Sequence, residues 1–179
     1  MAPADHDAIA DRFGAVVDGV TDWDAPTPVA EWRACDVVGH LTTWFPEFLA
    51  SGGIEIAHGD SGDPVGSWHR HDAEVRALLA ARGGESFTHP YVGTRSLADT
   101  VAQFYTADVF LHTWDLARAS GQDDRLDATL CEEMYAGMSS MGDMLRSSGQ
   151  FGEQQPVRAD AGPQERLIAF IGRDPYWTR

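Results

Sequence analysis

The stretch that decides the fold is LADTVAQFYTADVFLHTWDLARAS, residues 97–120. Its apolar side chains predict the longest helix of the chain, at about residues 97–119. Asp108, His112 and Asp115 recur in it at positions i, i+4 and i+7. At 100° per residue they lie within about 60° of one another, with about 6 Å of rise between Asp108 and His112. This helix is therefore expected to carry one polar stripe on an otherwise apolar surface.

The polar stripe has two interpretations, which its spacing alone leaves open. It is either the solvent-exposed face of the helix or a group that faces the core. In the core, burying a carboxylate costs free energy unless it is paired or binds a cation. His40 favours the second interpretation, because it lies three residues after Val37 and four before Trp44 on the apolar face of an earlier predicted helix. A lone histidine there is more often a hydrogen-bonded core residue, whereas two facing helices that each present a histidine are typical of metal sites in bundles. We predict that His40, Asp108 and His112 form a two-histidine, one-carboxylate metal site.

The remaining hydrophobic periodicity predicts an all-α protein. No strand alternation is convincing, and the stretch that contains Pro90 and Gly93 is expected to be a loop. The chain is predicted to be a single domain over residues 1–179, a four-helix bundle with one or two additional C-terminal helices. Besides the central helix, amphipathic helices are expected at about residues 6–20, 36 to the Gly52-Gly53 pair, 67–82, 128–146 and 163–171.

Composition excludes several classes of partner. The chain has 28 acidic and 13 basic side chains, a formal net charge of -15, and this field would repel nucleic acid phosphate and anionic lipid. Cys35 and Cys131 stand far apart without a CxxC companion, so we expect two reduced thiols rather than a disulfide scaffold. The first residues carry acids where a signal peptide would have basic and apolar ones, and no stretch approaches the roughly 20 apolar residues of a membrane span. A cytoplasmic protein is expected.

Three segments carry a resemblance to a known family. The pieces VVGHLTTWFP (residues 37–46), DVFLHTWDLARASG (108–121) and LIAFIGRDPYW (167–177) resemble the DinB-like superfamily of metal-binding four-helix bundles. More narrowly, they are similar to small actinobacterial proteins related to the metal-binding domain of mycothiol-dependent maleylpyruvate isomerase. The resemblance runs from Trp32 to Trp177.

The resemblance implies ligand positions that coincide with the predicted site. In the family, a His on the second helix and a carboxylate and a His four residues apart on the fourth helix hold the metal. His40, Asp108 and His112 match those positions. Family members often carry Glu where this chain has Asp108, and the shorter side chain moves the metal nearer the helix. Two histidines and one carboxylate leave coordination positions open, as in a catalytic zinc site, although the set also suits nickel and non-haem iron(II).

Further residues are expected around the metal. Asp115 is a candidate for the group that accepts the second imidazole N–H of His112, and its alternative partner is Arg118. His71 and Trp44 are candidates for the border of the pocket. A packed or pocket-lining histidine is favoured over a fourth ligand at position 71, and core packing is favoured over substrate binding for Trp44. The other four histidines look like surface or loop residues without a role: His6, His58, His69 and His89.

The resemblance implies an enzyme in which the metal orients a low-molecular-weight thiol, such as mycothiol, for attack on an electrophilic small molecule. No protein nucleophile is needed, and no catalytic side chain is assigned. Maleylpyruvate isomerases carry a sizeable second domain that this chain lacks room for, so isomerase activity is not expected. Two alternatives stay open. One is a hydrolase that uses metal-activated water, and the other is a non-catalytic bundle in which His71 or Asp115 closes the metal site and exposed helix faces form a homodimer.

Overall fold

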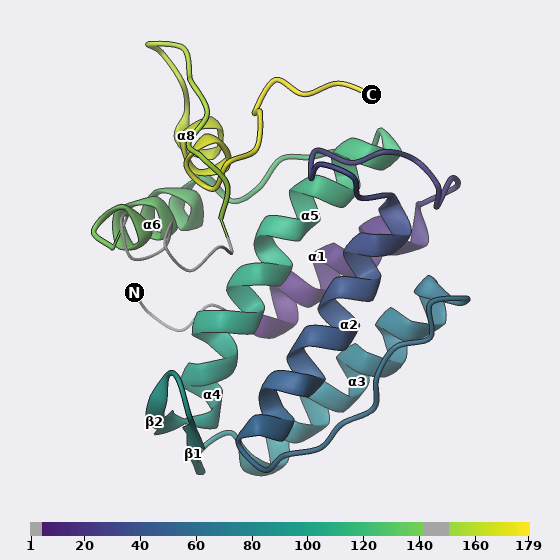
Figure 1. The fold of residues 1–179 in the computed structure, drawn as a ribbon, viewed down its shortest axis with the longest axis vertical. Coiled ribbons are helices and arrows are strands. Elements are labelled where there is room, and N and C mark those ends of the chain that lie inside the picture. Colours follow the sequence, from purple (N-terminus) through teal and green to yellow (C-terminus); the bar gives the residue numbers. More distant parts are fainter. Residues whose placement is uncertain (1–4, 142–150) are drawn as a thin grey trace.

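The computed structural model describes residues 5–141 and 151–179 and shows a mostly helical chain with one small hairpin. Four helical segments lie side by side in Figure 1: α1 (His6–Asp18), α2 (Ala34–Ser51), α3 (Pro64–Arg82) and α5 (Ala107–Ser120). α1 packs against α5 and α3, and α2 packs against α3 and α5. The all-α prediction is confirmed at this level. No helix in the described ranges is both long and apolar enough to cross a membrane.

Local sequence explains where α2 begins and how it continues through Pro46. The Asp36 carboxylate accepts the backbone N–H of Arg33 at 2.7 Å, which caps the first turn. Pro46 lacks an N–H and leaves the carbonyl of Thr42 without its helical donor. The N–H of Gly59 donates to that carbonyl at 3.0 Å. The loop after α2 therefore supplies the hydrogen bond that Pro46 cannot make, and it lies against the helix at this point.

α3 begins three residues before the predicted start. Asp63 is its N-cap and accepts the N–H of Gly66, and Pro64 occupies the first turn. A proline at this position suits a helix start, because its missing N–H is one that the helix leaves unpaired. The prediction read Pro64 as part of the preceding loop and was wrong there.

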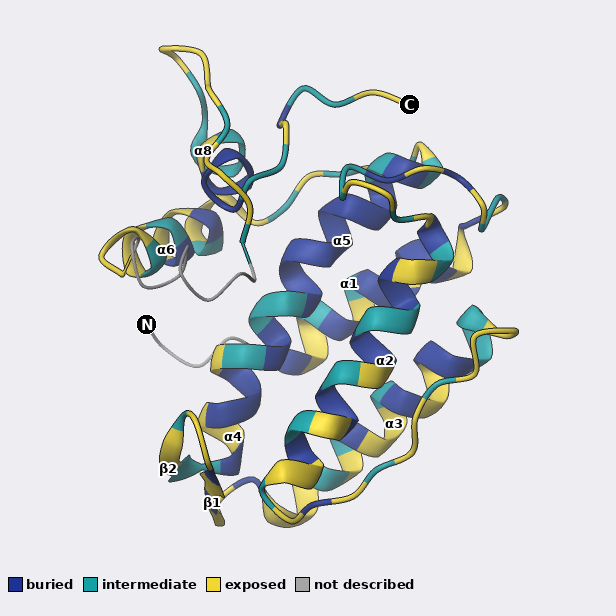
Figure 2. Ribbon diagram, viewed as in Figure 1, coloured by how far each residue is buried: buried dark blue, intermediate teal, exposed yellow. Residues whose placement is uncertain are grey.

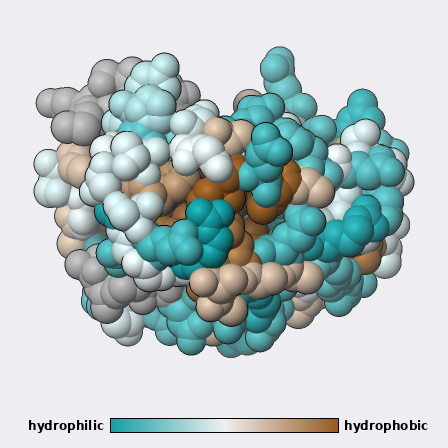
Figure 3. Space-filling view, turned by 90° about the horizontal axis from the view of Figure 1, so that it is seen from below, coloured by the Kyte–Doolittle hydropathy of each residue, from teal (hydrophilic) through white to brown (hydrophobic). Residues whose placement is uncertain are grey.

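The expected loop before the central helix is a hairpin. Strands β1 (Ser86–His89) and β2 (Gly93–Ser96) pair in antiparallel register, from Ser86 opposite Ser96 to His89 opposite Gly93. β1 alternates exposed and buried residues over only four positions, too few for a clear period in the sequence. The hairpin lies at the lower end of the molecule in Figure 1. Seen from below in Figure 3, hydrophilic side chains surround a smaller apolar area.

The central helix is continuous but has a wide turn in it. Ser96 caps it by accepting the N–H of Asp99. The chain then runs through α4 (Leu97–Thr100), the π-helix η1 (Val101–Thr106) and α5, and Gly121 ends it in the left-handed conformation at φ 68°. The sequence predicts one helix here without predicting the π-helical turn. Such turns are rare and frequent at functional sites.

A second layer covers the outer face of α5. It consists of α6 (Ala128–Ser139) and α8 (Pro163–Phe170), which pack against each other. Their apolar residues form a separate cluster with three side chains of α5: Phe110, Leu111 and Trp114. α5 is therefore buried on both sides, as its dark colour in Figure 2 shows. The part of the predicted helix 128–146 beyond Met141 lies outside the described residues.

The main core contains a ring stack that allows a stability test. Phe45 of α2 is fully buried and lies 3.9 Å from the ring of Tyr105, nearly parallel to it. We expect Phe45→Ala to lower the free energy of unfolding by about 3–5 kcal/mol, because it removes a large side chain from a packed core. Urea unfolding measures this. Tyr91→Ala is the control, since Tyr91 is 92% exposed at the hairpin tip. Equal effects of the two substitutions would contradict this description of the core.

Candidate metal centre

The structure brings His40, Asp108 and His112 together between α2 and α5. Nε2 of His40 lies 3.0 Å from Oδ2 of Asp108, and Nε2 of His112 lies 3.5 Å from Oδ1 of the same carboxylate. One ligand atom from each residue lies within 4.8 Å of the others. In the part of the chain that the structure describes, no other three His, Cys, Asp or Glu side chains form such a group. The predicted grouping of these residues is confirmed.

These distances fit a metal ion. Atoms at ~2.1 Å from a tetrahedral zinc lie ~3.4 Å from one another, close to the two separations at Asp108. The side chains of His40 and Asp108 are 31% and 25% exposed, whereas that of His112 is 4% exposed. The group therefore has one deeply buried ligand and two that border solvent. A divalent ion bound to the three has access from outside the protein.

Trp44 orients the carboxylate. Its indole N–H donates to Oδ2 of Asp108 at 2.9 Å. Burial tends to raise the pKa of Asp108, but the neighbouring imidazoles of His112 and His40, together with the Trp44 hydrogen bond, outweigh it and lower the pKa below its usual value. Asp108 is thus held as an anion, the form that binds a cation. The prediction that Trp44 borders the site is confirmed in position, with a hydrogen bond that the sequence did not predict.

Asp115 fixes the other nitrogen of His112. Oδ2 of Asp115 lies 2.8 Å from Nδ1 of His112 and is fully buried. An ionised carboxylate only accepts hydrogen bonds, so Nδ1 of His112 carries the proton in this contact, and Nε2 is the nitrogen that faces Asp108. Metal-binding histidines usually have such a partner. The expected role of Asp115 fits this contact, and the alternative pairing with Arg118 is wrong, because Arg118 pairs with Asp124.

Arg173 is a member of the site that sequence analysis missed. Its Nη2 lies 3.2 Å from Oδ2 of Asp115 and its Nε lies 3.4 Å from Oδ1. Burial tends to raise the pKa of Asp115, yet Arg173 and His112 outweigh it and lower the pKa. Arg173 stands 58 positions after Asp115, so helical spacing carries no sign of the contact. Its place in the segment LIAFIGRDPYW was the one available indication.

Trp32 is a second missed residue. Its ring centroid lies 5.6 Å from that of His112 at an interplanar angle of 19°, and 5.0 Å from that of His40. The preceding loop places it there: Thr27 N–H donates to the Trp32 carbonyl, and Glu31 adopts the left-handed conformation at φ 66°. That conformation is uncommon for a residue with a side chain. Trp32 therefore covers one side of both imidazoles.

His71 lies in the apolar core, outside the group of proposed metal ligands. It is 2% exposed, with its ring 5.5 Å from that of Tyr105 and 6.2 Å from that of Phe45. It is not part of the three-residue group. The prediction of a packed histidine is confirmed, and the prediction that it borders the metal pocket is not. Of the histidines expected at the surface, His6 and His89 are buried, because they lie against Tyr105 and Phe48.

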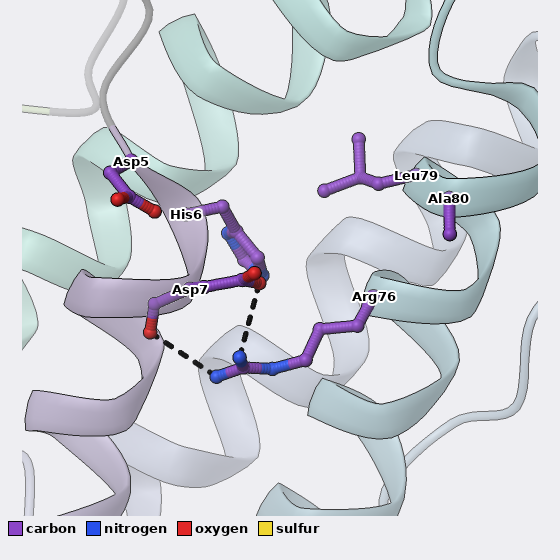
Figure 4. Close-up of a pocket in the computed structure, with 6 residues that line it drawn as sticks. All are labelled: Asp5, His6, Asp7, Arg76, Leu79 and Ala80. Atoms are coloured by element: carbon purple, nitrogen blue, oxygen red, sulfur yellow. Dashed lines mark hydrogen bonds and ion pairs between the residues drawn. The ribbon is translucent and has the colours of Figure 1, made fainter.

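A surface hollow lies between the start of α1 and the second half of α3. Figure 4 shows its lining residues, Asp5, His6, Asp7, Arg76, Leu79 and Ala80, which come from the start of α1 and the end of α3. Arg76 is paired there with Asp7, and it also contacts Asp11 and Asp72. The guanidinium of Arg76 is thus paired with three carboxylates. The hollow is separate from the group between α2 and α5.

Comparison with known proteins finds two similar chains from two strains of Mycobacterium tuberculosis. They are the uncharacterized proteins MT0763 and Rv0738, each 29% identical over 182 residues that cover 94% of this chain and 95% of the relative. No family model matches the chain, and no solved structure matches it. The names of these relatives assign no activity, so a function has to be argued from the site.

The buried position of His71 predicts a pH dependence of stability. Burial, and to a smaller extent His6 and His58, lowers its pKa from 6.5 to about 4. Between these values the unfolded chain binds the proton and the folded chain does not, so stability is fully present above pH 6.5 and is lost as the pH falls toward 4. His71 should contribute a loss of about 3 kcal/mol between pH 7 and pH 4, since one pKa unit equals about 1.4 kcal/mol.

Urea unfolding between pH 7 and pH 5 measures this, because most carboxylates titrate at lower pH. We expect His71→Gln to flatten the dependence, and His69→Gln, a half-exposed histidine on the same helix, is the control for the loss of an imidazole. An unaltered pH dependence in His71→Gln would show that His71 is not the responsible group.

Proposed function

We propose that His40, Asp108 and His112 hold a divalent metal ion, zinc by ligand preference, and that the protein is a metal-dependent enzyme acting on low-molecular-weight thiols. The observation that carries the proposal is the convergence of three ligand atoms from two helices, two of them on partly exposed side chains. A metal with open positions lowers the pKa of a thiol or water that binds it. The resemblance to DinB-like proteins favours the thiol.

The surroundings of the group support an open site over a closed structural one. A closed zinc site has four protein ligands. Asp115 is engaged by His112 and Arg173, and His71 lies outside the group, so neither candidate for a fourth ligand is in place. Trp32 and Trp44 flank the ligands without a metal-binding atom. A coordination position is thus left for a small molecule.

The cysteines support an external thiol. Burial, with smaller contributions from Asp36 and Asp24, raises the pKa of Cys35. Burial also raises the pKa of Cys131 to about 12. Since the thiolate is the nucleophile, the raised pKa values favour the unreactive thiol form of both side chains near neutral pH. The protein's own residues would hold and orient the metal, keep Asp108 and Asp115 ionised, and leave the nucleophile to the cosubstrate.

Metal analysis after loading with zinc, nickel or iron(II) and removal of excess ion tests the site. Wild type should retain one ion per chain, and His112→Ala should lose most of it because the buried ligand is gone. His69→Ala is the matched control, a histidine paired with Asp18 outside the group. Equal metal content in wild type and His112→Ala would contradict the assignment.

The metal-loaded protein should consume a low-molecular-weight thiol in the presence of an electrophile, and His112→Ala should not. Thiol loss is followed with a chromogenic thiol reagent over a set of electrophilic substrates, with cysteine-containing thiols that include mycothiol. Retained metal without thiol consumption would contradict the transferase. Metal-dependent hydrolysis of activated esters without thiol would support the hydrolase in its place.

A further inference from the structure

Arg173 forms a buried, two-point ion pair with Asp115. Its side chain is 13% exposed and that of Asp115 is fully buried. Nε and Nη2 of the guanidinium each face a different carboxylate oxygen, at 3.4 and 3.2 Å. This two-bond arrangement fixes direction as well as charge. Arg173 therefore determines how the Asp115 carboxylate is turned.

The backbone that carries Arg173 is itself fixed. Gly172 has φ 91°, and a Cβ there would lie 2.5 Å from the Cα of Gly152, so only glycine fits. The N–H of Arg173 donates to the carbonyl of Ile168 at 3.1 Å, and its guanidinium donates to the carbonyl of Ile171. Arg173 thus projects from a rigid turn at the end of α8. The position of α8 on α5 is what places the guanidinium.

The same carboxylate oxygen of Asp115 serves two donors. Oδ2 lies 2.8 Å from Nδ1 of His112 and 3.2 Å from Nη2 of Arg173. A rotation of Asp115 away from Arg173 would also move its bond to His112. A chain of direct contacts therefore runs from the turn after α8 to the most buried of the proposed metal ligands.

A role in stability alone does not account for this arrangement. Replacing a buried ion pair by apolar residues of similar size is often neutral or stabilising, so the pair is weak support for a purely structural purpose. The second layer already has an apolar cluster that holds α8 against α5, with Leu167, Ile168 and Ile171 fully buried. Apolar packing already sets the position of α8 on α5, so what the Arg173–Asp115 ion pair adds is the orientation of the Asp115 carboxylate.

We propose that Arg173 is a positioning residue and that the turn after α8 is energetically coupled to the His40–Asp108–His112 group. Docking of Arg173 on Asp115 holds the His112 ring through its Nδ1, so that Nε2 points toward Asp108. By linkage, an ion on the three residues tightens the docking by the same factor. The part that concerns metal affinity rests on the proposed function, and the part that concerns His112 does not.

The first test measures zinc affinity by competition with a chromophoric chelator. We expect Arg173→Met to weaken zinc binding about tenfold, the lower end of the effect of removing a partner behind a metal ligand. Arg118→Met is the matched control: Arg118 also holds the C-terminal segment, through the carbonyl of Pro175, but pairs with Asp124 instead of Asp115. Equal affinities of the two variants would overturn the proposal.

Two further variants guard against loss of the fold. Arg173→Met leaves Asp115 buried without its charge partner, so the double variant Arg173→Met/Asp115→Asn removes that charge. It should fold and still bind zinc weakly. Arg173→Lys keeps the charge without the two-point contact and should lie between wild type and Arg173→Met. Wild-type affinity in both variants would contradict a positioning role.

The second test needs no metal. Long-range ¹H–¹⁵N correlation spectra of the metal-free protein identify which nitrogen of His112 carries the proton. Wild type and Arg118→Met should show the Nδ1 proton of His112 that Asp115 accepts, and in Arg173→Met the signal of this proton should be shifted or lost. If wild type binds no zinc but this change occurs, the proposed function fails and the positioning role stands. If the spectrum of the His112 ring in Arg173→Met is the same as in wild type, the positioning role of Arg173 is overturned.

Hydrogen exchange tests the reciprocal effect. Zinc should slow amide exchange in the segment from Leu167 to Arg179 of wild type, and the slowing should be lost in Arg173→Met. Equal slowing in both proteins would show that the segment and the metal group are not coupled through Arg173.

Discussion

Asp108 places a carboxylate on a helix that is otherwise buried, and a buried carboxylate needs partners. It obtains them from two sides: His40 and Trp44 of α2 contact Oδ2, and His112 faces Oδ1 from the next turn of its own helix. These contacts require α2 and α5 to lie side by side at this level. The same contacts bring two imidazoles and an anion to one point. The need of the Asp108 carboxylate for hydrogen-bonding partners thus aligns the two helices and forms the candidate site.

The site is supported by layers on either side. Trp32 covers the imidazoles from the loop before α2, and Asp115 holds His112 from behind. Arg173 holds Asp115 in turn, from a turn that the α6–α8 layer positions. The second layer is therefore more than an addition to the bundle. It supplies the charge that keeps a carboxylate ionised where burial opposes ionisation.

Helical spacing predicted the parts of this arrangement that lie within one or two turns. Asp108, His112 and Asp115 were predicted as one stripe, and the contacts of His112 with both acids agree with it. The prediction that His40 faces this stripe rested on its position on the apolar face of its helix together with the family resemblance, and its contact with Asp108 agrees with it. The two ends of the central helix are set by local sequence as well, because Ser96 caps its first turn and Gly121 adopts the left-handed conformation at its end.

Other features of the site depend on contacts between residues that are far apart in the sequence, which helical spacing does not predict. Arg173 and Trp32 reach the site through turns whose paths the sequence does not specify. At Val101–Thr106 the backbone forms a π-helix in place of an α-helix. Similar residues occur in both kinds of helix, so the sequence does not predict the change. His71 faces the interior as predicted, but which part of the interior it faces depends on how α3 crosses α2. The resemblance to DinB-like proteins remains a prediction about ancestry and chemistry beyond this helical arrangement.

The central claim is that His40, Asp108 and His112 bind one metal ion and leave a position open. Zinc K-edge X-ray absorption on the protein loaded with one equivalent of zinc, without added thiol, tests it most directly. The account predicts two imidazole nitrogens and a carboxylate oxygen at ~2.0–2.2 Å, with a further light atom from solvent. Sulfur in the first coordination sphere, or an unchanged spectrum in His112→Ala, would contradict it.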